Sequence, residues 1–155
     1  MTPSKTLFGA IALAVFTATA SFADGIMIHD AYARSAGKMA KAGAAFFMIK
    51  NETYWDDRLI DVKSTAAKKV ELHTHVDQGG GVMKMVHVED GFAIPAGGMH
   101  MLKRGGDHVM FMGLNSAWEQ GDLLPLTLVF EKAGEIDLEV QVDLERQETK
   151  DHSSH

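Results

Sequence analysis

The chain has 155 residues, with 15 lysines and arginines against 21 aspartates and glutamates, and a formal net charge of −6. An acidic chain without basic clusters is a poor partner for nucleic acid or for an anionic lipid surface, so we expect neither. The chain contains no cysteine, which excludes disulfides and any metal site built on thiolate.

The first 23 residues have the pattern of a secretory leader. Lys5 precedes an apolar run over Leu7–Ala20, and the small-residue site Ser21-Phe22-Ala23 comes directly after it. This order predicts a signal peptide over residues 1–23 that is cleaved after Ala23, and therefore an exported, periplasmic protein. The apolar run is shorter than the roughly 20 residues that span a bilayer, so we expect no membrane insertion after cleavage.

The chain beyond the leader is long enough for one domain with a real core and too short for two. We expect this domain over residues 24–148 and a flexible histidine-containing tail over residues 149–155. Short apolar or alternating runs separated by turn residues predict an all-β fold, an antiparallel β-sandwich. The expected strands are Ile26–Arg34, Gly43–Asn51, Asp57–Ser64, Lys69–Val76, Val82–Val88, Met99–Leu102, His108–Leu114, Leu124–Glu131 and Ile136–Leu144.

Strand alternation places two histidines together on the outer face of Val70–Val76. His73 and His75 point away from the apolar face that Val70 and Leu72 begin, because successive side chains alternate across a strand. Both imidazoles are therefore expected to lie outside the core.

The next predicted strand continues this arrangement. Met83, Met85 and His87 share one face of Val82–Val88, and they line up with the two histidines if Asp77–Gly81 closes a hairpin. Farther along, His108, Met110 and Met112 alternate with the expected core residues Val109 and Phe111. Imidazoles and thioethers are thus expected on the outer face of three strands.

This combination of side chains indicates copper. Thioether sulfur is a soft ligand that favours Cu(I), and imidazole binds copper in either oxidation state. Structural and catalytic zinc sites use histidine, cysteine and carboxylate, while calcium and magnesium require oxygen ligands in a density that no loop here offers. A blue-copper electron carrier needs a cysteine thiolate, which this chain lacks.

Each element has a simpler interpretation when taken alone. A single methionine such as Met83 or Met85 is as often a packing residue as a ligand, and a single histidine is more often a hydrogen-bonded surface residue. The joint occurrence of His73-Thr74-His75, Met83-Lys84-Met85 and His108-Val109-Met110 in an exported, cysteine-free chain favours the copper site.

At these residues the sequence resembles the PCu(A)C periplasmic copper chaperones, whose motif is H-(M)-x10-M-x21-H-x-M on a cupredoxin-like β-sandwich. The resemblance extends over nearly the whole chain after the leader. Its segments are His29–Arg34, Gly43–Phe47, Val70–His75, Gly81–Met85, Ile94–Gly98, His108–Leu114 and Pro125–Glu131.

By this resemblance the copper ligands are His73, Met85, His108 and Met110, with His75 and Met83 as secondary candidates. Both intervals, from His73 to Met85 and from Met85 to His108, are one residue longer than in the family motif. We place the extra residues in the turns at Asp77–Gly81 and near Glu89-Asp90-Gly91, where an insertion need not disturb paired strands.

The resemblance implies a Cu(I) chaperone, not an enzyme, that delivers copper toward the CuA centre of cytochrome c oxidase, with a Sco-type thiol protein or an oxidase subunit as partner. Copper buffering or resistance is the alternative role, and a small extracytoplasmic metalloenzyme is a less favoured one. Such a copper oxygenase would use an N-terminal histidine, whereas cleavage after Ala23 exposes Asp24.

The tail offers a second, separate possibility. His152 and His155 lie near Asp151 and the chain terminus, a set of nitrogen and oxygen ligands that suits Cu(II) better than Cu(I). The alternative is a solvated end without a function of its own.

Overall fold

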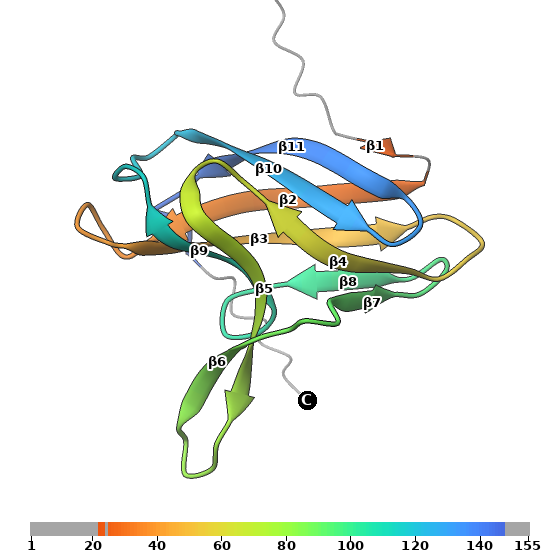
Figure 1. Cartoon of the computed structure of the whole chain (residues 1–155), viewed down its shortest axis with the longest axis horizontal. Helices are drawn as coiled ribbons and strands as arrows, with labels where there is room; N and C mark the ends of the chain where they lie inside the picture. Colours follow the sequence, from red (N-terminus) through yellow and green to blue (C-terminus); the bar gives the residue numbers. More distant parts are fainter. Residues whose placement is uncertain (1–21, 24, 148–155) are drawn as a thin grey trace, which may run out of the picture.

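The structure is a computed structural model that describes residues 22–23 and 25–147. These residues form eleven strands and no helix, which confirms the predicted all-β fold (Figure 1). The strands are β1 (Phe22–Ala23), β2 (Ile26–Ser35), β3 (Ala42–Asn51), β4 (Asp57–Lys63), β5 (Ala67–Asp77), β6 (Met83–His87), β7 (Phe92–Ile94), β8 (Met99–Leu102), β9 (His108–Leu114), β10 (Leu123–Phe130) and β11 (Gly134–Val142). No helix within these residues is long and apolar enough to cross a membrane.

The strands form one continuous sheet in the order β6-β5-β9-β3-β2-β11-β10-β4-β7. Strand β1 adds to β2, and β8 pairs with β3. The sheet folds over so that apolar side chains of β3 and β9 share one core with those of β4, β10 and β11, as in a sandwich. One pair departs from the predicted antiparallel arrangement: β11 runs parallel to β2 where Gln141 and Val142 pair with Tyr32 and Ala33.

All the strands predicted from alternation are present, with ends that shift by at most two residues. Strands β1 and β7 are additional to the predicted set. β7 has only three residues, lies between Gly91 and Pro95, and pairs with β4 alone. A run that short carries no periodic signal, so its strand conformation depends on the neighbour that it pairs with.

The core beneath the candidate site contains Leu72, Val109 and Phe111, each at most 2% exposed. The Phe111 ring meets the edge of the buried Trp118 ring at a centroid distance of 5.1 Å. Trp118 lies directly over Gly43, where a Cβ atom would be 2.3 Å from the indole ring. The absence of a side chain at position 43 is therefore what lets the indole close this end of the core.

The ends of β5 and β6 project as a hairpin beyond the body of the molecule (Figure 1). Gly79, Gly80 and Gly81 at its tip all have positive φ values, which glycine adopts without strain. The pairing of β5 with β6 confirms the predicted hairpin, and these three glycines at its tip have open space around them. The proposed leader, apart from Phe22 and Ala23, and the tail with His152 and His155 lie outside the described residues.

Candidate metal centre

Three neighbouring strands, β6, β5 and β9, carry the predicted ligands. His73 in β5 is directly opposite His87 in β6 on one side and His108 in β9 on the other. Residues directly opposite each other in antiparallel strands have side chains on the same face, with Cβ atoms about 4.5–5.5 Å apart. Three imidazoles therefore lie in one row across the sheet.

The rings of His73 and His108 are close, with centroids 6.0 Å apart. His108 is only 2% exposed, and its Nδ1 donates a hydrogen bond of 2.9 Å to the carbonyl oxygen of Gly106. This bond leaves Nε2 with its lone pair available to a metal. Burial lowers the pKa of His108 and the nearby His75 and His73 lower it further, while the bond to Gly106 opposes them. The ring is thus neutral near pH 7, the state that binds metal.

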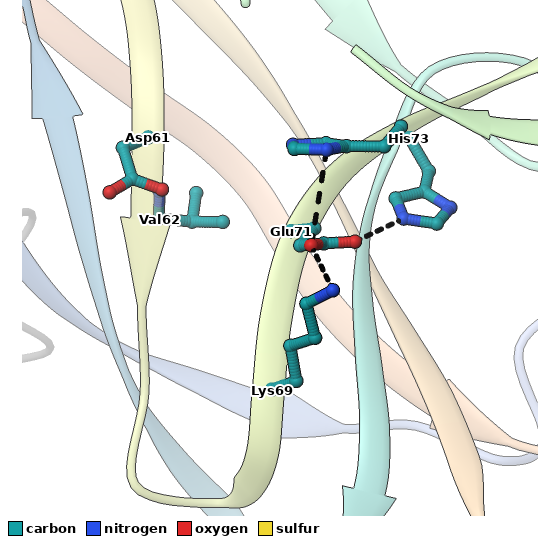
Figure 2. A network of polar contacts seen from close by, with 6 residues as sticks. Asp61, Val62, Lys69, Glu71 and His73 are labelled. Atoms are coloured by element: carbon teal, nitrogen blue, oxygen red, sulfur yellow. Dashed lines mark hydrogen bonds and ion pairs between the residues drawn. The ribbon is translucent and has the colours of Figure 1, made fainter. Parts of the chain in front are cut away.

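His73 is oriented by a carboxylate. Its Nε2 donates to the Glu71 carboxylate over 2.9 Å, and Glu71 also pairs with Lys69 at 2.6 Å (Figure 2). The hydrogen bond from His73 lowers the pKa of Glu71, and the bond from Lys69 lowers it further. The other ring nitrogen of His73, Nδ1, is buried and has no hydrogen-bond partner. Buried polar atoms are nearly always satisfied, so an unpaired imidazole nitrogen beside His108 fits the role of a metal-binding atom.

His75, a secondary candidate, lies close to His108. Their ring centroids are 5.2 Å apart, and His75 Nδ1 donates to the same Gly106 carbonyl over 3.2 Å. One backbone oxygen thereby sets the orientation of two imidazoles and leaves the Nε2 atom of each available. No pattern in the sequence identifies this carbonyl.

The predicted methionines flank the pair of histidines. Met85 is opposite His75, and Met110 is opposite Glu71, so each is one diagonal step from His73. Met83 is opposite Asp77 near the hairpin tip, two residues farther along the strand than Met85, or about 7 Å. This register favours Met85 over Met83 as a ligand.

The arrangement is suited to a soft metal. Among residues 22–23 and 25–147, no group of three or more His, Cys, Asp or Glu side chains could hold a metal ion by itself. The imidazoles of His73 and His108 are instead accompanied by thioethers, and both have a nitrogen available for coordination. A neutral set of nitrogen and sulfur donors fits Cu(I).

Two residues besides the predicted ligands contribute to the site. His87 stacks on His73 with a centroid distance of 5.9 Å, and Glu71 lies beneath both rings, 3.9 Å from His87 Nδ1. Alternation places both residues on the outer face, and this is the signal that could have identified them. The remaining secondary candidates, His152 and His155, are not within the described residues.

Comparisons with known proteins identify the family and the fold. The family model described as "Putative lipoprotein LpqE-like" matches residues 26–142. "Putative lipoprotein Lxx21020" from Leifsonia xyli subsp. xyli (strain CTCB07) is 35% identical over 108 residues, which cover 70% of this chain and 63% of that protein. The match therefore spans less than two thirds of that relative's length.

Solved structures of PCuAC domains have the same fold. The copper-bound PCuAC domain from PmoF2 has a TM-score of 0.65 at 24% identity, covering 80% of this chain and 97% of that domain. The solution structure of CuI-DR1885 from Deinococcus radiodurans has a TM-score of 0.61 at 25% identity, covering 77% of this chain and 78% of that one. The family match over most of the described chain, together with this shared cupredoxin-like fold, shows that the chain belongs to the LpqE-like family, the same family as the PCuAC domains that its motif residues resemble.

Proposed function

We propose that this protein is an exported copper chaperone that binds Cu(I) through His73, Met85, His108 and Met110 and passes it to another protein. Copper is bound by the PmoF2 domain and Cu(I) by DR1885, which share the fold. The leader pattern and the description of its relatives as lipoproteins support export, and we place the protein in the periplasm.

The observation that carries the proposal is the pair of imidazoles, His73 and His108, on adjacent strands. Each has one nitrogen held by a hydrogen bond and the other available, and the available nitrogen of His73 is buried without a partner. Such outer hydrogen bonds fix the tautomer and orientation of metal-binding histidines. With the thioethers of Met85 and Met110 beside them, the site is organised for Cu(I) before the ion arrives.

The exposure of the ligands suits transfer. His108 is almost fully buried, whereas Met85 is 48% exposed on β6, the strand at the end of the sheet. A thiol of a receiving protein could displace the accessible thioether first and the buried imidazole last, so copper need never be free in solution. We assign no catalytic step to any residue.

We propose delivery toward the CuA centre of cytochrome c oxidase, with a Sco-type thiol protein or an oxidase subunit as receiver, on the basis of the family resemblance alone. Copper buffering or resistance is the alternative role for the same site. Loss of CuA assembly in a deletion strain, restored by the wild-type gene but not by His108→Ala, would support delivery; normal assembly together with copper sensitivity would favour buffering.

The binding site is tested by anaerobic Cu(I) titration against a competing chelator, with X-ray absorption to count nitrogen and sulfur ligands. We expect one tightly bound Cu(I) and at least a tenfold loss of affinity in His108→Ala, or about 1.4 kcal/mol. Met85→Leu should weaken binding more than Met83→Leu, since the two changes conserve volume and differ in distance from His73. Unchanged affinity in His108→Ala would exclude this residue from the site, and equal effects of the two leucine variants would exclude the assigned register.

A further inference from the structure

A second row of soft side chains crosses the sheet away from the candidate centre. His29 in β2 is directly opposite Met48 in β3, and Met48 is directly opposite Met101 in β8. Because directly opposed residues share a face, with Cβ atoms about 4.5–5.5 Å apart, one imidazole and two thioethers lie side by side in a row across three adjacent strands. The pairing of β2 with β3 is interrupted immediately after His29, where Asp30 has a φ of 54°. Bulges of this kind commonly re-aim side chains at functional sites.

These side chains are accessible. Met101 is 53% exposed, and His29 and Met48 are half-buried. Met48 and Met101 both line a surface cavity of about 500 Å³. Met99, which is 56% exposed, lies on the same face of β8 two residues before Met101. A strand that presents two exposed methionines gains little core packing from them, so their thioethers are available as ligands.

This second row is separate from the first. Ala44 in β3 is directly opposite Met110, and Met48 lies four residues farther along β3 on the same face. At roughly 3.4 Å per residue, Met48 is offset along the strand by about 14 Å from the Met110 register and by about 7 Å from that of His108, which is two residues nearer. Phe46 lies between them, 6% exposed, with its ring 6.3 Å from the His108 ring. One ion cannot reach both rows, although both lie on the same face of the sheet.

The charges around the second row disfavour a divalent ion more strongly than a monovalent one. Lys50 is the next outward residue of β3, and the cavity is also lined by Lys103, Arg104 and Arg146. Asp30, the acidic residue that lines the cavity, is paired with Arg146. Repulsion from these cations acts twice as strongly on a divalent ion as on a monovalent one, and no carboxylate among the proposed ligands offsets it. Neutral thioether and imidazole donors themselves favour Cu(I).

We propose that His29, Met48 and Met101 form a second Cu(I) site, weaker than the first, on the same face of the protein. The choice of ion rests on the proposed function, in which Cu(I) is the cargo. An accessible three-ligand site would let the protein hold a second Cu(I) or accept an incoming ion before the buried centre does.

The test is anaerobic Cu(I) titration with competing chelators of graded affinity, together with native mass spectrometry. It is done in a His152→Ala/His155→Ala background, so that the tail cannot supply ligands. We expect a second equivalent of Cu(I) that binds at least tenfold more weakly than the first. Met48→Leu/Met101→Leu should abolish it and leave the first equivalent unchanged, whereas the matched control Met39→Leu, at a methionine that is 87% exposed, should change neither. Zn(II) should not bind at this site.

The outcomes separate this inference from the proposed function. His73→Ala/His108→Ala should lose the tight equivalent and keep the weak one. If the protein with intact ligands binds only one Cu(I), and this variant binds none, the second site is overturned and the proposed function stands. A second equivalent that survives Met48→Leu/Met101→Leu unchanged would also overturn it. A third outcome would support the second site and refute the assigned chaperone site. In it, Met48→Leu/Met101→Leu loses only the weakly bound Cu(I), and His73→Ala/His108→Ala still binds the tight Cu(I) with wild-type affinity. Thermal unfolding of each variant establishes that it is folded.

Discussion

Glu71 is expected to control copper binding without contacting the ion. Its carboxylate accepts the hydrogen bond from His73 Nε2 at 2.9 Å and so keeps Nδ1 as the nitrogen that carries a lone pair. The side chain is 14% exposed, so water can replace this bond only in part. Removal of outer hydrogen-bond partners of metal-binding histidines typically lowers affinity by about 10–100-fold. Glu71→Gln retains an acceptor oxygen but loses the charge, so we expect about a tenfold weaker Cu(I) complex, or about 1.4 kcal/mol.

The measurement is competition for Cu(I) at pH 7.5 by a chelator of known affinity. Lys69→Gln is the matched control, because it removes the other close partner of Glu71 and leaves the bond to His73 in place. The Lys69 side chain is 64% exposed, and exposed ion pairs contribute about 0–1 kcal/mol, so the control should change affinity by less than about fivefold. Wild-type affinity in a folded Glu71→Gln protein would refute the view that this carboxylate orients His73.

Further predictions concern stability, pH and the tail. Gly43→Ala should lower the free energy of unfolding by about 1–3 kcal/mol in denaturant titration, because the new methyl group overlaps the Trp118 ring, whereas Gly106→Ala, with only ordinary contacts, should have little effect. Burial lowers the pKa of His108, so its contribution to stability is complete above the unfolded-state pKa of about 6.5 and declines as the pH falls below it. The free energy of unfolding should therefore drop from pH 7.5 to 5.5 by more in the wild type than in His108→Ala; equal drops would contradict this. Deleting residues 151–155 should abolish the binding of one Cu(II) ion in calorimetric titration and leave Cu(I) affinity unaltered. Unchanged Cu(II) binding would show that the tail is not a copper site.

The local part of the candidate site could be predicted from the sequence. Side chains alternate strictly along a strand, so His73 and His75 had to share a face, as did Met85 and His87. The glycine-rich turn between the two strands determined that they pair as a hairpin, and the register His75 opposite Met85 is a consequence of that turn. The same periodicity located the strands that build most of the sheet. Whether these residues bind copper remains a prediction.

Tertiary structure alone decided which distant strands meet. His108 faces His73 because β9 inserts between β5 and β3, a choice that depends on the order of the whole sheet and not on the residues near either histidine. The parallel pairing of β11 with β2 has the same origin. So does the row of His29, Met48 and Met101, whose members lie on three strands that no local pattern connects. Alternation along a strand is a property of the chain, whereas pairing between strands is selected by burial of the shared core. The face on which each side chain lies could therefore be predicted from residue order, and the residues that lie next to it on other strands could not.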